Sequence, residues 1–247
     1  MKCLQCGVEN EDDRNFCISC QAELFKEPYK DYKDSRILTN NTVLVLSMTF
    51  ILTFIDIVFA FMDIRVWQKV KTGIIYESEA SAISNQYLDI QLYYRVPMII
   101  LLIISFILVL TWIYRANKNS HALGAINMKY SPLGAIGWYF IPILNFFKPY
   151  RAMIEIYQTS VSSKDWENTH ISGYIWLWWS TWALSWVVSY KDIKAIFSKV
   201  TQSELSSAIS WFIEDILTLL ATIFIIIIIK TIYKYQVKNF AAKVMTK

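Results

Sequence analysis

The sequence predicts an all-α polytopic membrane protein: four transmembrane helices, a broken or re-entrant segment, an interfacial helix and a small N-terminal zinc ribbon with four cysteine ligands. Hydrophobic residues make up 55% of the 247 residues and aromatic residues 16%. Charged residues make up 18%, below the roughly 25% that is typical of soluble domains. They are concentrated between four apolar stretches, each close to the roughly 20 residues that a transmembrane helix needs. The remaining observation is a cluster of four cysteines near the N-terminus.

Residues 1–25 are predicted to form the zinc ribbon, because their cysteines have the spacing C-x2-C-x10-C-x2-C. Each C-x2-C pair forms a tight turn that directs two thiolates toward one point, and two such turns supply the ligands of a tetrahedral Zn²⁺ site. Four sulfur ligands leave no open coordination position, so the metal is expected to be structural. Two disulfides, or iron in the same cage, are the alternatives. The predicted ligands are Cys3, Cys6, Cys17 and Cys20.

A basic linker, residues 26–41, is expected to lead into the first transmembrane helix over residues 42–62. Thr53, Asp56 and Asp63 fall on one face of this helix, which should therefore point into the bundle. A charged carboxylate inside an apolar span is costly. Asp56 is thus predicted to be either an ion or proton site, or a hydrogen-bonded carboxyl that joins two helices.

Three further transmembrane helices are expected over residues 96–114, 171–190 and 209–229, followed by a basic tail at 239–247. The polar residues 64–94 would connect the first two helices on the outer side. The third helix carries five tryptophans. They could line a lipid or ligand groove, but packing bulk is the preferred interpretation because aromatic rings bury large areas.

The most unusual stretch is residues 133–147, which is apolar but interrupted by glycine and proline. It is too short for a transmembrane helix, and proline both removes a backbone donor and disfavours helix for the residue before it. We therefore expect a re-entrant segment that enters and leaves the membrane on the same side. Irregular backbone at membrane depth has to be covered, so the other helices should pack around it.

Residues 149–161 are predicted to form an interfacial amphipathic helix. One face carries the apolar residues Tyr150, Met153, Ile154, Tyr157 and Val161. The other face carries the polar residues Arg151, Glu155, Gln158 and Thr159. The helix follows the re-entrant segment directly, and the two share a motif that consists of Pro142, Asn145, Pro149, Tyr150 and Arg151.

The distribution of Lys and Arg predicts the orientation. With four spans and a re-entrant segment, both termini lie on one side, together with most of the 24 Lys and Arg residues. Cytoplasmic segments carry an excess of these residues, so both termini are expected in the cytoplasm and the protein in the plasma membrane. The cysteines then lie in a reducing compartment, which favours zinc over disulfides.

This orientation places a group of ionisable residues in the outer half of the membrane or at its outer edge. One interpretation is a salt bridge from the single arginine of the group to one or two of the carboxylates. The other is an acidic outer mouth that attracts cations. The group consists of Asp56, Asp63, Arg95, Glu214 and Asp215.

Residues 114–155 contain several short motifs that are typical of one family. They are Tyr-Arg-Ala at 114–116, Ala-Leu-Gly at 122–124, Ser-Pro at 131–132, Gly-Trp at 137–138 and FIPILNFFKPYRAM at 140–153. With these residues the chain resembles a bacterial membrane family known as domain of unknown function 4328. The resemblance covers roughly residues 42–238, to which a zinc ribbon is a common N-terminal addition. It implies a polytopic membrane domain and brings no activity with it.

No H-E-x-x-H, G-x-S-x-G, P-loop or dinucleotide-binding motif occurs in the chain, so we expect a protein that is not an enzyme. The preferred interpretation is a membrane scaffold or sensor whose cytoplasmic zinc ribbon docks a protein partner. The alternative is a small transporter, channel subunit or lipid-handling protein that uses the broken segment and Asp56. A third interpretation is a membrane enzyme that acts on lipid through Asn145, Arg151 and Glu155.

The expected surroundings are the lipid bilayer and a cytoplasmic protein partner, and an oligomer is left open. Nucleic acid is not expected as a partner of the ribbon. The ribbon carries only Lys2 and Arg14 as basic residues, and acidic residues outnumber them. Binding to phosphate backbones needs the opposite balance.

Overall fold

The computed structural model describes residues 3, 5–11, 14, 16–22, 31–198 and 203–245, except for the side chains of 191–198 and 245. It is all-helical, as predicted. The helices are α1 (Arg36–Lys71), α2 (Glu77–Ala122), α3 (Pro132–Gly137), α4 (Lys148–Val161), α5 (Gly173–Ser198) and α6 (Glu204–Met245), with the short 3₁₀ turns η1 (Trp138–Phe140) and η2 (Leu144–Phe146).

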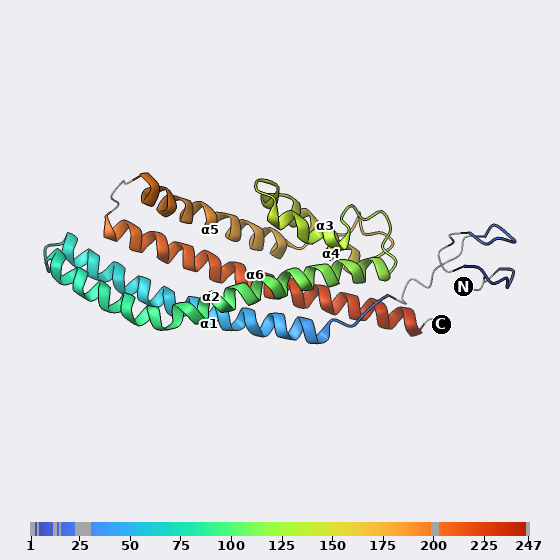
Figure 1. Cartoon of the computed structure of the whole chain (residues 1–247), viewed down its shortest axis with the longest axis horizontal. Coiled ribbons are helices and arrows are strands. Elements are labelled where there is room, and N and C mark those ends of the chain that lie inside the picture. Colours follow the sequence, from blue (N-terminus) through green and yellow to red (C-terminus); the bar gives the residue numbers. More distant parts are fainter. Residues whose placement is uncertain are drawn as a thin grey trace.

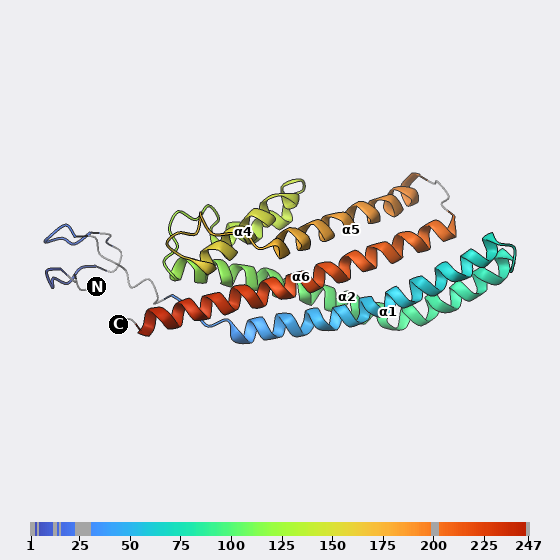
Figure 2. The same cartoon turned by 180° about the vertical axis from the view of Figure 1, so that it is seen from behind.

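The helices form an elongated bundle (Figure 1). α1 and α2 form one antiparallel pair, α5 and α6 form another, and α1 also packs against α6. The start of α1 and the ends of α2 and α6 lie at one end of the bundle, and α3 and α4 lie at that end as well (Figure 2). The turn between α1 and α2 lies at the opposite end, and so does the start of α6.

Three helices, α1, α2 and α6, are long and apolar enough to cross a membrane. They have 36, 46 and 42 residues, or about 54, 69 and 63 Å at about 1.5 Å per residue, against a hydrocarbon core of roughly 30 Å. Each therefore extends well beyond a bilayer. The fourth span predicted over 171–190 falls on α5. In α5, tryptophan and serine residues stand between the aliphatic ones. That α5 spans a membrane stays a prediction.

The connection between α1 and α2 is shorter and more helical than the polar composition of residues 64–94 suggests. α1 continues to Lys71 and α2 already begins at Glu77, so only residues 72–76 form the turn. The turn contains Gly73, which has a φ of +72°; its N–H donates to the Val70 carbonyl and the next N–H donates to the Lys69 carbonyl. This is the left-handed glycine cap that ends many helices.

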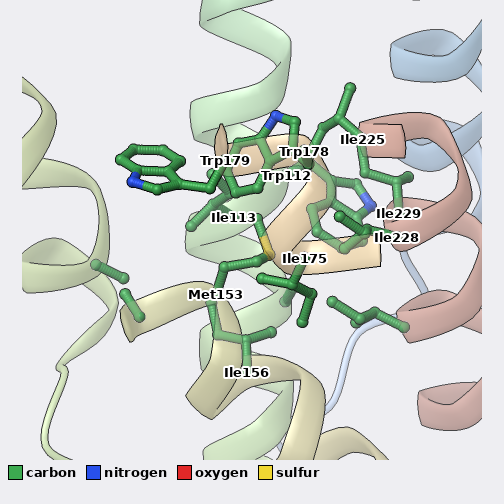
Figure 3. Packing of buried hydrophobic residues seen from close by; sticks show 14 of the residues in the cluster. Trp112, Ile113, Met153, Ile156, Ile175, Trp178, Trp179, Ile225, Ile228 and Ile229 are labelled. Carbon is green, nitrogen blue, oxygen red and sulfur yellow. The ribbon is translucent and has the colours of Figure 1, made fainter. Parts of the chain in front are cut away.

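The core lies where α2, α4, α5 and α6 meet (Figure 3). The labelled side chains are Trp112, Ile113, Met153, Ile156, Ile175, Trp178, Trp179, Ile225, Ile228 and Ile229. Trp178 and Trp179 are buried there, whereas Trp176 and Trp186 are exposed. The tryptophan-rich helix therefore uses two of its rings as packing bulk, in agreement with the preferred interpretation of these residues.

Candidate functional site

The four cysteine sulfurs of the ribbon lie within 4.8 Å of one another and can hold a metal ion. The Sγ atoms of Cys3 and Cys20 are 3.7 Å apart, and those of Cys6 and Cys17 are 3.5 Å apart. A tetrahedron with metal–sulfur bonds of about 2.3 Å has edges of about 3.8 Å. A disulfide would need about 2.05 Å. The geometry thus fits a shared metal ion and not a pair of disulfides.

The two cysteine turns have the same backbone pattern. The N–H of Gly7 donates to the Cys3 carbonyl, and the N–H of Gln21 donates to the Cys17 carbonyl. Gly7 has a φ of +78° and Gln21 a φ of +56°. Gln21 therefore adopts the left-handed conformation that glycine would adopt more easily. The repetition explains how two short segments direct four sulfurs to one point.

Backbone N–H groups also favour the thiolate form of two ligands. Hydrogen bonds, first that from the N–H of Cys6, lower the pKa of the Cys3 thiol. The N–H of Cys20 is the largest cause that lowers the pKa of the Cys17 thiol to about 6. Because metals bind the thiolate, these hydrogen bonds favour the metal-binding form of Cys3 and Cys17. For Cys20 the N–H of Ala22 lowers the pKa, but burial and the neighbouring cysteines outweigh it and raise the pKa to about 12.

Asn10 holds the two cysteine turns together, and the spacing of the cysteines does not reveal it. Its side chain is buried; Nδ2 donates to the Val8 carbonyl at 2.8 Å and contacts the Cys17 Sγ at 3.6 Å. Its Oδ1 accepts from the N–H of Ile18 at 2.8 Å. Asn10 thus joins the two cysteine turns. In the sequence it stands among acidic residues with nothing to single it out.

Residues 132–147 fold back on themselves at the end of the bundle where α2 ends. Before the segment, the Asn117 side chain donates to the Tyr130 carbonyl at 3.1 Å; after it, the Thr159 hydroxyl donates to Ser120 at 2.9 Å. The residue before the segment and the last turns of α4 are therefore both attached to the last turns of α2. The chain does not continue to the far end of the bundle, and the re-entrant path stays a prediction (Figure 1).

The helices cover this segment on one side only. The Phe140 ring packs edge-on against Phe106, and the indole of Trp179 donates to the Phe146 carbonyl at 2.9 Å. Phe140 nevertheless remains exposed, as do Ile143 and Phe147. The expectation that the other helices surround the segment is therefore wrong for its outer side, which presents an apolar surface.

The motif residues of this segment have separate places. Pro142 is exposed, Asn145 has a side-chain oxygen that is buried without a hydrogen-bond partner among the described residues, and Pro149 is buried in the first turn of α4. Proline fits there because the first-turn N–H has no intrahelical partner. Tyr150 stacks on the Trp179 ring, whereas Arg151 is exposed. The motif therefore shapes the segment and does not converge on one point.

The polar face predicted for α4 is wrong for three of its four residues. Glu155, Gln158 and Thr159 are buried, and only Arg151 is exposed. The Glu155 carboxylate accepts from the N–H groups of Lys129 and Tyr130 at 2.9 and 3.0 Å. Burial of a carboxylate is tolerated when hydrogen bonds satisfy its oxygens. Both oxygens of Glu155 are thus engaged in anchoring the loop before α3, which argues against its use as a catalytic base.

A cavity of about 480 Å³ lies beside the exposed side of α4. Its lining residues are Lys129, Tyr130, Trp138, Lys148, Arg151, Ile154, Glu155, Gln158 and Trp166. The Nζ of Lys148 lies 5.4 Å from the centre of the Trp138 ring, in cation–π contact. Sequence reasoning missed this site because residues 129 and 166 come from two loops that flank the segment and helix.

A buried polar cluster joins the same ends of α2, α4 and α6. Gln236 is 1% exposed; its Nε2 donates to the Ala116 carbonyl at 2.8 Å and to Ser160 Oγ at 3.0 Å. Asn119 Nδ2 lies 3.4 Å from the Gln236 Oε1. The predicted basic tail at 239–247 is therefore part of a packed helix as far as Met245, and Lys243 contacts the Leu123 carbonyl.

The outer ionisable residues join helices and do not form the predicted salt bridge. The hydroxyl of Tyr94 donates to the Asp56 carboxylate at 2.7 Å, and Ser84 contacts Asp63. Arg95 donates to Gln91 at 3.2 Å, and within residues 31–190 and 203–244, where side chains are described, it forms no ion pair with a carboxylate. For Asp56 the arrangement supports the interpretation as a carboxyl that joins two helices.

Glu214 and Asp215 lie on α6, across from α1 and α2, the helices that carry the residues just described. Asp215 is within electrostatic range of Asp56, Glu214 and Arg95. The predicted outer group is therefore brought together by the fold, although the arginine neutralises none of its members by direct contact. Asp63 lies further along α1, where its partner Ser84 belongs to the first part of α2.

These features define a class: a helical protein with three helices that are long and apolar enough to cross a membrane, a folded-back apolar segment and a four-cysteine cluster that can bind metal. The family model described as domain of unknown function (DUF4328) matches residues 81–234, and the chain belongs to this family. The match begins at residue 81 near the start of α2, includes α3 to α5 and ends within α6 at residue 234; it leaves out α1, the last part of α6 and the cysteine cluster. Comparison with curated proteins and with solved structures gives no match.

Proposed function

We propose that the protein is a non-catalytic scaffold or sensor of the plasma membrane whose cytoplasmic ribbon docks a protein partner. The ion in the ribbon is Zn²⁺ in a structural role: a cage of four sulfurs has no position for substrate or water. In this proposal α5 is the fourth span, the segment 132–147 is re-entrant, and both termini lie in the cytoplasm.

The observation that carries the docking proposal is the exposure of two apolar side chains on the ribbon. Phe16 is 57% exposed and Ile18 is 53% exposed, on either side of the buried ligand Cys17. A metal-stabilised segment has no need of a large aromatic group in water, and such groups are enriched at protein interfaces. Residues 1–25 carry more acidic than basic residues, although Glu11 is paired with Arg14 at 3.2 Å. The partner is therefore a protein with an apolar pocket and a basic rim.

The transporter alternative has less support. Its key residue, Asp56, has a carboxylate that accepts a hydrogen bond from Tyr94. A hydrogen bond that joins two helices is sufficient to explain why an acidic residue stands within a helix bundle. The enzyme alternative is weaker still, because Glu155 is engaged by two backbone N–H groups.

The proposed orientation predicts which exposed positions can be reached from outside an intact cell. Single cysteines at Thr72 and Ser203 should react with a membrane-impermeant maleimide, because these residues lie at the end of the bundle opposite the start of α1. Cysteines at Asn127 and Lys164, also exposed, should react only after lysis. All variants are made in a chain whose four native cysteines are replaced, and this cysteine-free chain is the control. Reaction at Lys164 in intact cells would refute both the re-entrant segment and the cytoplasmic C-terminus.

The docking proposal predicts that the full-length protein, solubilised in mild detergent, co-purifies with one protein in constant stoichiometry. The double variant Phe16→Ser/Ile18→Ser should lose this protein and retain its metal, because neither side chain is a ligand. The matched control is Phe140→Ser/Ile143→Ser, which removes two apolar groups of similar exposure from the membrane domain. Equal co-purification by the ribbon variant, or the absence of any stoichiometric partner, would contradict docking through this surface.

A further inference from the structure

The cavity beside α4 combines three cations with very little available negative charge. Lys129 comes from the loop before α3, and Lys148 and Arg151 come from the first turn of α4. Glu155 is the acid in its lining, and its two oxygens already accept from the N–H groups of Lys129 and Tyr130. Within residues 31–190 and 203–244, Arg151 forms no ion pair, Glu155 included. The cavity thus offers cationic groups to an anion.

Two residues that line the cavity stand at either end of the folded-back segment, which presents an apolar surface. Trp138 and Lys148, which line the cavity, flank residues 139–147 in the chain. Within that segment Phe140, Ile143 and Phe147 are exposed. A ligand that fills the cavity would therefore have cations around one part of it and an apolar surface within reach of another. A free anion would use only the first of these features.

The cavity walls are also of the kind found at a membrane interface. Trp138 lies under the Lys148 ammonium group, and Trp166 is held by a hydrogen bond from its indole N–H to the Ile126 carbonyl at 2.9 Å. Tryptophan and basic side chains both concentrate at the level of lipid headgroups. A volume of about 480 Å³ is ample for a phosphate with its substituent.

We propose that this cavity binds the phosphate headgroup of an anionic phospholipid, with Lys129, Lys148 and Arg151 around the phosphate and the acyl chains along Phe140, Ile143 and Phe147. Arginine matches phosphate oxygens with two parallel hydrogen bonds, and lysine supplies a compact charge. In the orientation proposed above, the cavity lies at the cytoplasmic leaflet. This placement rests on the proposed function, whereas the binding of the lipid does not. A lipid-binding experiment in detergent can therefore fail or succeed independently of that orientation and of docking by the ribbon.

The test measures binding of phosphatidylglycerol and phosphatidylcholine with identical acyl chains to the purified full-length protein, by native mass spectrometry in neutral detergent. The protein should bind phosphatidylglycerol in preference to phosphatidylcholine. The variant Lys129→Gln/Lys148→Gln/Arg151→Gln should bind phosphatidylglycerol at least about tenfold more weakly, since it loses three charge-assisted contacts. Its folding is checked by unfolding in the same detergent. Should the triple variant unfold, Arg151→Gln alone, at an exposed position, should show at least half of this loss on a logarithmic scale.

The matched control is Lys164→Gln/Lys234→Gln/Lys238→Gln, which removes three exposed charges at the same end of the bundle, outside the cavity lining. It should bind phosphatidylglycerol as the unmodified protein does. An equal loss in both variants would reduce the effect to general surface charge and overturn the proposal. So would unchanged binding by the cavity variant. Displacement of the lipid by millimolar inorganic phosphate, with no preference between the two lipids, would identify a free anion as the ligand and overturn the lipid assignment.

Discussion

Replacing Cys17 by serine should abolish stoichiometric metal binding and unfold the ribbon. Cys17 is fully buried and supplies one of the four sulfurs that lie within 4.8 Å of one another. Among the residues of the ribbon that the structure describes, the buried hydrophobic cluster consists of Cys3 and Cys17 with Val8 and Ala22 beside them. Metal binding therefore has to supply the folding free energy, on the order of 10–16 kcal/mol for structural zinc in small domains.

The measurement is metal content per chain by mass spectrometry of the purified full-length protein, together with the rate of proteolysis of residues 1–22. The unmodified protein should contain one zinc ion and resist cleavage, and Cys17→Ser should contain none and be trimmed rapidly. Ser19→Ala, an exposed change in the same turn, is the control. Iron in place of zinc would refute the assigned ion. A Cys17→Ser protein with unchanged metal content would refute the site itself.

Asn10→Ala should give an intermediate result in the same assay. The variant keeps all four sulfurs but loses the side chain that contacts Cys17 Sγ and accepts from the Ile18 N–H. Outer-shell partners of metal ligands typically contribute a factor of about 10–100 in affinity. The variant should therefore be loaded at saturating zinc and lose the ion to a chelator at concentrations that leave the unmodified protein intact. Equal resistance in both proteins would show that Asn10 does not support the metal.

Gln236→Ala should strongly destabilise the helical bundle. The side chain is 1% exposed and its amide donates to the Ala116 carbonyl and to Ser160 Oγ. Truncation removes both hydrogen bonds and opens a cavity between α2, α4 and α6. Each lost hydrogen bond costs about 0.5–1.5 kcal/mol and the cavity adds to this cost, so we expect a loss of about 3 kcal/mol in the free energy of unfolding.

Denaturant unfolding of the protein in detergent measures this loss. Gln236→Met separates its two causes, because methionine fills the space but cannot donate. If hydrogen bonding dominates, the methionine variant is nearly as unstable as the alanine variant; if packing dominates, it recovers most of the loss. Lys238→Ala, two residues further along the same helix and exposed, should change the stability by less than about 0.5 kcal/mol. A Gln236→Ala protein as stable as this control would contradict a structural role of the cluster.

Periodicity predicted where the helices lie but misjudged which polar residues they bury. For α4 it separated apolar from polar residues correctly, yet Glu155, Gln158 and Thr159 face other parts of the protein instead of water. An amphipathic pattern assumes that polar side chains seek solvent. Here the loop before α3 supplies backbone N–H groups to Glu155, and the Ser120 hydroxyl accepts from Thr159. No pattern within 149–161 contains these partners.

The broken segment is an intermediate case. Its prolines and its short apolar length were enough to predict that it does not continue as a helix, because proline removes a donor and restricts the residue before it. They also predicted that the chain turns back. How far the segment is covered could not be predicted, since cover depends on where α2 and α5 lie. The result is a segment with Phe106 and Trp179 on one side and an exposed apolar surface on the other.

The sequence by itself determined which four cysteines can gather around a metal ion, where the helical runs lie and that residues 133–147 do not continue as one helix, because each depends on residues that are close together in the chain. Only the tertiary structure decided the buried partners: Gln236 meets Asn119 across 117 residues, and the cavity beside α4 is assembled from two loops and a helix. The physical reason is that burial and hydrogen bonding are properties of pairs in space. The spacing of residues in the sequence can identify one residue of such a pair. Its partner comes from a distant part of the chain and is known only from the packing of the helices.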